Sequence, residues 1–137
     1  MTAEVFLDTN ILLYACSSAD ADAPRQLRAA ELIETSRFGL SAQVLQEFVA
    51  NALRKPELGI SETGIDALLE LSGDVPVFPV SRELVLSATI LRRRHRLSHW
   101  DAAIVAAAQE LGCHTLYTED LNSGQEYEGV RVINPFL

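Results

Sequence analysis

The sequence predicts an α/β fold: a three-layer α/β/α sandwich around a central, mostly parallel five-stranded sheet. Short apolar segments alternate along the chain with longer segments whose apolar residues recur at helical spacing, a pattern typical of parallel strands covered by helices. The connections are only a few residues long, and no repeat or Pro/Gly/Ser-rich linker separates the segments. We therefore expect one domain over residues 1–137, with the carboxyl ends of the parallel strands along one edge of the sheet.

The strand signal comes from short segments rich in Val, Ile, Phe, Leu and Tyr. Each is a brief apolar run bounded by polar or turn-forming residues, as expected for strands buried on both faces. Their length separates them from the longer helical segments between them. The expected strands are 5–7, 38–40, 77–80, 115–117 and 130–133.

The helical segments carry apolar residues three or four positions apart. Pro24 begins one of them, because proline suits the first turn of a helix, and Pro56 ends another. The segment from Ser98 to Gly112 is small and apolar nearly all round, which predicts a helix packed against the sheet. The expected helices are 10–15, 24–33, 43–55, 61–71, 82–95 and 98–112.

The charge balance limits the partners this chain can bind. Its 19 acidic and 11 basic side chains give a net charge of -8, which disfavours broad adhesion to nucleic acid or to anionic membranes. Any nucleic-acid chemistry must therefore be local. The longest apolar stretch, 102–108, is shorter than the ~20 residues of a membrane span, and the first residues lack the pattern of a signal peptide. We expect a cytoplasmic protein without membrane association.

Only two cysteines occur, Cys16 and Cys113. They lack CxxC spacing and a partner set of His or Cys, so a disulfide framework, a zinc ribbon and a redox motif are all unsupported. We interpret both as reduced packing residues.

Acidic residues stand where the predicted fold would place a ligand site. In open parallel sheets, ligands bind outside the carboxyl ends of the strands. Asp8 directly follows the first strand, Asp120 follows the strand 115–117, and Asp101 lies in the first turn of the preceding helix. Glu47 falls about 300° around its helix from Val44, at the margin of the apolar face, where its side chain can reach a cleft.

Each of these acids also has an ordinary explanation. Asp8 and Asp120 fit as turn or loop formers, and Glu47 fits as a solvated helix residue. Ser98 and Asp101 match a capping box that satisfies the start of a helix. Taken singly, the ordinary explanation holds for most of them. Their convergence at one sheet edge is what favours a functional site.

The candidate acids stand in four blocks of sequence: Phe6-Leu7-Asp8-Thr9-Asn10-Ile11-Leu12, Glu47-Phe48, Trp100-Asp101-Ala102-Ala103-Ile104 and Thr118-Glu119-Asp120-Leu121. In this order along the chain, the four blocks resemble the PIN-domain family, most closely the ribonuclease toxins of the VapC type. The resemblance extends over nearly the whole chain, including the ending Gly129-Val130-Arg131-Val132-Ile133-Asn134-Pro135-Phe136.

The resemblance implies an acidic metal site of four residues, with two polar neighbours that orient them. It also implies Mg²⁺ or Mn²⁺ as cofactor, cleavage of RNA, a small antitoxin partner that occupies the acidic cleft, and a homodimer. The implied metal and catalytic residues are Asp8, Glu47, Asp101 and Asp120, and the polar neighbours are Asn10 and Thr118.

Elementary electrostatics makes such a site intelligible. Two carboxylates ~5 Å apart repel by roughly 3 kcal/mol at an effective dielectric near 20, and a divalent cation removes this conflict. Oxygen ligands without paired His or Cys favour Mg²⁺ or Mn²⁺ over Zn²⁺. We expect Asp8 and Asp101 as direct ligands, Asp120 as a direct or water-mediated ligand, and Glu47 as a water-orienting ligand or base; one ion or two fit equally.

A cluster of basic residues is the sequence feature that fits phosphate binding, through Arg92, Arg93, Arg94 and Arg96. The same arginines also suit the negative end of a helix dipole, so both interpretations stay open. Trp100 could stack an RNA base, but we interpret it as a core residue. Lys55, the single lysine, fits either a phosphate contact or a solvated helix end.

Three other classes of protein are alternatives. A receiver-like phosphoacceptor domain also has an acidic pocket after its first strand, but it needs a lysine near that pocket, and Lys55 follows a helix. A phosphatase of the haloacid-dehalogenase type would want an Asp where Asn10 stands. A PIN-like fold kept only for protein binding would not need all four acids. The sequence therefore predicts a metal-dependent endoribonuclease, the toxin of a toxin–antitoxin pair.

Overall fold

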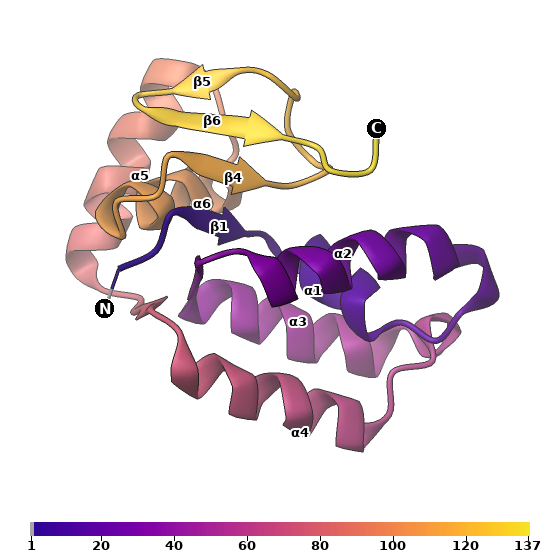
Figure 1. Ribbon diagram of the computed structural model, residues 1–137. Coiled ribbons are helices and arrows are strands. Elements are labelled where there is room, and N and C mark those ends of the chain that lie inside the picture. Colours follow the sequence, from indigo (N-terminus) through magenta and orange to yellow (C-terminus); the bar gives the residue numbers. More distant parts are fainter. Residues whose placement is uncertain (1) are drawn as a thin grey trace.

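The computed structural model describes residues 2–137 and contains the predicted three layers (Figure 1). The central sheet has six strands in the order β3-β2-β1-β4-β6-β5. Every neighbouring pair is parallel except β5 with β6, which is antiparallel. The strands are β1 Val5–Leu7, β2 Phe38–Ser41, β3 Val77–Phe78, β4 Thr115–Tyr117, β5 Glu126–Tyr127 and β6 Val130–Ile133.

Six α-helices and three short 3-10 turns connect the strands. Serine side chains begin several helices: the Ser41, Ser61, Ser81 and Ser98 hydroxyls each accept a hydrogen bond from a backbone N–H of the first turn. The helices are α1 Thr9–Cys16, α2 Ala23–Thr35, α3 Ala42–Arg54, α4 Glu62–Leu71, α5 Arg82–His95 and α6 His99–Glu110.

The strand order creates a switch point between β1 and β4. From β1 the chain moves outward to β2 and β3, then returns across the sheet to β4 on the other side of β1. Right-handed crossovers therefore place α1 to α4 on one face and α5 and α6 on the other. Figure 1 shows these two groups of helices on different sides of the strands. The carboxyl ends of β1 and β4 flank the position at which open α/β sheets bind ligands.

The core lies between the sheet and both helical layers. Phe6 and Leu7 of β1 are completely buried, as are Val44 and Phe48 of α3. All residues of the 102–108 segment of α6 are buried, which confirms the expectation of a helix packed against the sheet. Cys16 is half-buried and Cys113 is buried, and both are free thiols. None of the helices described in residues 2–137 combines the length and hydropathy of a membrane-spanning segment.

The sixth strand, β5, was not predicted. It has only two residues, Glu126–Tyr127, and forms a hairpin with β6. Glu126 is exposed while Tyr127 is buried, and the turn uses left-handed backbone at Glu128 and Gly129. A segment so short has too few residues to show the alternation that marks a strand.

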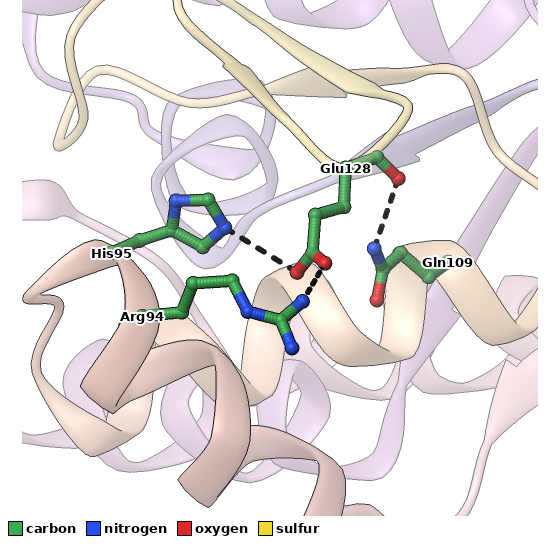
Figure 2. A network of polar contacts seen from close by, with 4 residues as sticks. All are labelled: Arg94, His95, Gln109 and Glu128. Atoms are coloured by element: carbon green, nitrogen blue, oxygen red, sulfur yellow. Dashed lines mark hydrogen bonds and ion pairs between the residues drawn. The ribbon is translucent and has the colours of Figure 1, made fainter.

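A polar network fixes this hairpin to the helices (Figure 2). Glu128 forms an ion pair with Arg94, and its carboxylate lies within hydrogen-bond distance of His95 Nε2, at 3.3 Å. Gln109 Nε2 donates to the Glu128 carbonyl oxygen at 3.0 Å. The turn precedes β6, which runs parallel to β4, so the network lies toward the amino-terminal edge of the strands. Arg94 therefore has a structural partner away from the carboxyl edge.

Candidate active site

Asp8 is the buried centre of the acidic site. It caps α1, and its Oδ1 accepts a hydrogen bond from Thr9 N at 2.7 Å. Its backbone N donates to Tyr117 O at 3.1 Å, so the ladder between β1 and β4 continues into the site. Thr118 Oγ1 donates to Asp8 Oδ2 at 2.8 Å. The carboxylate is held from both strands, and the residue is only 6% exposed.

Burial of the carboxylate raises the pKa of Asp8 to about 7. The hydrogen bonds from Thr118 and Thr9 oppose this shift, because they stabilise the charged form. The negative charges of Asp120 and Glu47 add to it. Three acids from separate segments are therefore electrostatically coupled, as expected for one shared site.

Thr118 and Asn10 link Asp8 to Asp120. Asn10 Nδ2 donates to Thr118 Oγ1 at 3.2 Å and to Asp120 Oδ2 at 3.1 Å, and Asp120 N donates to Thr118 Oγ1 at 3.1 Å. Asp120 itself is exposed, while Thr118 is fully buried. The two residues expected as polar neighbours thus hold both aspartates directly. Asn10 Oδ1 is buried and has no hydrogen-bond partner in the described part of the chain.

Glu47 reaches the site from α3. Thr9 Oγ1 donates to its Oε2 at 3.3 Å, and Gln43 Nε2 donates to its Oε1 at 2.7 Å. Gln43 is buried, and the same Nε2 donates to the carbonyl oxygen of Trp100 at 3.2 Å. Gln43 therefore ties α3 to the start of α6 while it orients the Glu47 carboxylate.

Asp101 lies in the first turn of α6, and its N donates to Ser98 Oγ at 3.1 Å. The predicted helix cap is therefore present. Burial raises the pKa of Asp101, the Ser98 hydroxyl lowers it, and the Asp120 carboxylate raises it. The last of these effects couples Asp101 to the acidic group. Asp101 thus serves the helix start and faces the site at the same time.

The four acids are coupled in pairs: Asp8 feels the charges of Asp120 and Glu47, and Asp101 feels the charge of Asp120. Within residues 2–137, no three His, Cys, Asp or Glu side chains are close enough to hold a metal ion as they stand. In that same part of the chain, none of the four acids forms an ion pair with a basic side chain. The group consists of Asp8, Glu47, Asp101 and Asp120.

The donor chemistry fits a hard divalent cation. Carboxylate oxygens are the ligands that Mg²⁺ and Mn²⁺ prefer, and the acidic group contains neither His nor Cys. The buried, unpartnered Asn10 Oδ1 is a further oxygen that a cation or its bound water can satisfy. The donor chemistry of these residues therefore fits the metal that the resemblance implies.

A cleft of about 220 Å³ is lined by two of these acids, Glu47 and Asp120. Lys55, at the end of α3, lines it as well. Lys55 is half-buried and forms no ion pair in the part of the chain described. At another wall, Tyr14 Oη donates to Glu119 at 3.0 and 3.2 Å. The cleft thus combines acidic oxygens with one lysine.

The arginine cluster lies at the end of α5, where the dipole interpretation placed it. Arg94 is engaged by Glu128, and Arg96 caps the helix in left-handed backbone, with φ of 56°. Arg92 and Arg93 form no ion pair among residues 2–137. None of the four arginines lines the cleft above the carboxylates.

Two site residues were missed or misjudged from the sequence. Trp100 was expected in the core, and this was wrong: its side chain is 65% exposed at the start of α6. The polar residues on both sides of it, His99 and Asp101, were the signal of an exposed turn. Gln43 was not singled out, because it falls on the polar side of its helix, about 100° from Val44, and no pattern in the sequence indicates its burial.

Comparisons with known proteins agree with this geometry. The family model described as the PIN domain matches residues 5–124. The solved structure of the toxin VapC20 from Mycobacterium tuberculosis, described as cleaving the sarcin–ricin loop, is similar with a TM-score of 0.68 and 24% identity, covering 85% of this chain and 90% of that one. Among curated protein sequences, none matches the chain at a significant level.

Two structures of assemblies are also similar. A toxin–antitoxin complex from Klebsiella pneumoniae gives a TM-score of 0.68 at 20% identity, covering 96% of this chain and 98% of that one. A DNA-bound VapBC complex from Salmonella typhimurium gives 0.66 at 18% identity, covering 96% and 97%. At these identities the likeness establishes the shared α/β fold, which confirms the predicted architecture.

Proposed function

The chain belongs to the PIN domain family, and from this membership we propose that it is a metal-dependent endoribonuclease that hydrolyses phosphodiester bonds of single-stranded or looped RNA. The proposed nuclease unit is a single domain over residues 1–137. Membership of the PIN domain family excludes the receiver-like phosphoacceptor and the phosphatase as alternatives. It leaves a catalytically silent binding module as the competing interpretation.

The observation that carries the proposal is the electrostatic coupling of four acids from separate segments, none of which has a basic partner among the described residues. Because Asp8 is buried, its carboxylate loses hydration and is repelled by Asp120 and Glu47, which raises the free energy of the folded chain. A surface that only binds proteins gains nothing from unpaired carboxylates that destabilise the fold. A site that binds a cation and so recruits phosphate requires such carboxylates.

Each acid has a proposed role that follows from its surroundings. Asp8, Asp101 and Asp120 would hold Mg²⁺ or Mn²⁺, with Asp120 binding directly or through water. When bound, such an ion supplies Lewis-acid chemistry: it lowers the pKa of a water molecule and offsets charge on the phosphate. Glu47 is oriented through both of its oxygens by Gln43 and Thr9, so it is placed to accept a proton from the attacking water.

Lys55 is the proposed contact to the RNA backbone. It lines the same cleft as Glu47 and Asp120, and its ammonium has no ion pair in the described structure. Because the chain carries a net charge of -8, a phosphate gains little from the protein as a whole and needs a local cation. Lys55 supplies that cation at the edge of the acidic group.

A toxin role belongs to the same proposal. The similar structures include toxins and toxin–antitoxin complexes of full-length overlap. We infer that this chain pairs with a small antitoxin that offers a basic side chain to the acidic cleft, and that it forms a homodimer. Growth arrest on expression, reversed by co-expression of a neighbouring coding sequence, tests the toxin role separately from the chemistry.

The nuclease proposal is tested by a gel assay on a mixture of structured and unstructured RNAs. The wild-type chain is incubated with Mg²⁺, with Mn²⁺ and with excess chelator, beside Asp8→Asn and Asp66→Asn. Asp66 is an exposed residue of α4, so Asp66→Asn removes the same charge far from the site. We expect cleavage that requires the metal, is retained by Asp66→Asn and is lost in Asp8→Asn. A silent binding module would cleave under none of these conditions.

A further inference from the structure

Trp100 is exposed where a tryptophan would ordinarily be covered. It is 65% exposed and is the only tryptophan of the chain. Its position is fixed on both sides: Gln43 Nε2 holds its carbonyl oxygen, and the His99 ring contacts the indole edge to face, with centroids 5.1 Å apart at 74°. A large aromatic side chain that is held in place and left in solvent indicates a binding surface.

The indole forms one wall of a groove of about 480 Å³ between α3 and α6. The other walls are Gln43, Gln46, Glu47 and Ala50. Glu47 also lines the cleft that contains Lys55, so one residue borders both hollows. Trp100 in turn directly precedes Asp101. The groove therefore lies beside the acidic site.

We infer that this groove, here named the Trp100 groove, binds an unpaired nucleobase of the RNA substrate by stacking it on the indole. The inference rests on the proposed function and adds a substrate subsite to it. A strand whose phosphate lies near Lys55 crosses Glu47 and places a neighbouring base against Trp100. The exposed amide of Gln46, which makes no hydrogen bond within the described residues, offers a donor and an acceptor to the base edge.

The lining of the groove suits a nucleobase. Most of its exposed surface is apolar, and Gln43, Gln46 and Glu47 add polar groups to it. A base offers polar edges to these groups and a flat face to the indole. Because the net charge of -8 weakens phosphate attraction, stacking must supply much of the affinity for a single strand.

The single tryptophan makes the inference directly measurable. The Asp8→Asn chain, which does not consume the substrate, is titrated in Mg²⁺ with a short single-stranded RNA and with an abasic ribose-phosphate strand of equal length. We expect the RNA to quench the Trp100 fluorescence and the abasic strand to bind more weakly without quenching. Equal responses to the two strands, or no quenching by RNA, would overturn the inference.

Substitution supplies the second measurement. In the same background, Trp100→Ala is expected to weaken RNA binding by about 5-fold to 100-fold, the range found when a stacking residue is removed. Trp100→Phe keeps a stacking face and is expected to retain most of the affinity. Leu53→Ala, at another exposed apolar side chain of α3 outside both hollows, is the matched control and should bind as the parent does. Circular dichroism confirms that each variant folds.

The outcomes separate the inference from the proposed nuclease activity. If the chain with Asp8 intact cleaves RNA while Trp100→Ala leaves both the dissociation constant and KM unchanged, the activity stands and the Trp100 groove is not a base site. If Trp100→Ala changes the oligomeric state in sedimentation and not the RNA affinity, a second copy of the chain covers the groove and the inference is wrong. If RNA quenches Trp100 but is never cleaved, the base site stands without the nuclease.

Discussion

Replacing Asp8 by asparagine should stabilise the metal-free protein at neutral and alkaline pH. The carboxylate is buried, and its pKa is raised from the ordinary value of 3.8 to about 7 in the folded protein. The folded state therefore binds the proton more tightly than the unfolded chain does. As a result, the free energy of unfolding of the wild-type protein falls as pH rises from about 4 to about 7, and it changes no further above that.

The size of the effect follows from that pKa difference. The change from 3.8 to about 7 corresponds to about 4 kcal/mol of lost stability at pH 8. Asparagine has no charge to bury, and its Oδ1 can still accept from Thr9 N. Its Nδ2 cannot accept the Thr118 hydroxyl proton, which costs about 1–2 kcal/mol. Asp8→Asn should thus be more stable by about 2–3 kcal/mol at pH 8, or roughly 6–12 °C in Tm.

Thermal unfolding followed by circular dichroism in excess chelator measures this difference. We expect the advantage of Asp8→Asn to be largest at pH 8 and to shrink steadily toward acid. It should vanish near pH 5, where the remaining charge effect of about 1.6 kcal/mol equals the cost of the lost Thr118 hydrogen bond. Asp66→Asn is the matched control for the loss of one charge. A difference that does not depend on pH, or a variant less stable than wild type at pH 8, would refute the reasoning.

Three further substitutions test the surroundings of the acidic group. Lys55→Ala should weaken RNA binding, and the slope of log affinity against log salt concentration should fall by about one. Arg54→Ala, which removes the adjacent exposed charge, should have a smaller effect. Native gels at several salt concentrations measure both variants. Gln43→Ala should lower kcat by about ten-fold, because Glu47 loses its 2.7 Å hydrogen bond, and should also raise KM, because Gln43 lines the Trp100 groove and holds the Trp100 carbonyl oxygen; steady-state kinetics would show an unchanged kcat if Gln43 only supports the fold. Glu128→Ala should lower the free energy of unfolding by about 1 kcal/mol or less, measured by denaturant unfolding, because the contacts of Glu128 with Arg94 and His95 lie on the surface. RNA cleavage should be unchanged. Lost cleavage would implicate the Arg94 network in the reaction.

Residues tied to the regular sheet were predictable from the sequence. Asp8 and Asp120 follow strands with clear apolar patterns, so the topology of a parallel sheet alone places them at one edge. Glu47 could be oriented by its angle around α3. The positions of these residues are set by the backbone, and the spacing of apolar residues along the sequence predicts that backbone.

Residues whose role depends on packing between helices were not predictable. The exposure of Trp100 depends on how closely α3 approaches the start of α6, and the buried position of Gln43 depends on the same contact. No local pattern encodes this distance. The pairing of Arg94 with Glu128 likewise requires the hairpin formed by β5, which is too short to carry a strand signal.

The central claim is that acids from four segments form one site for a hard divalent cation. Titration calorimetry of Mn²⁺ tests it most directly, with the wild-type chain compared with Asp8→Asn, Asp101→Asn and Asp120→Asn, and with Asp66→Asn as control. We expect saturable binding to the wild type and the control, and affinity at least about ten-fold weaker in each of the other three variants. Equal Mn²⁺ affinity in all of these proteins, or no binding to the wild type, would contradict the account.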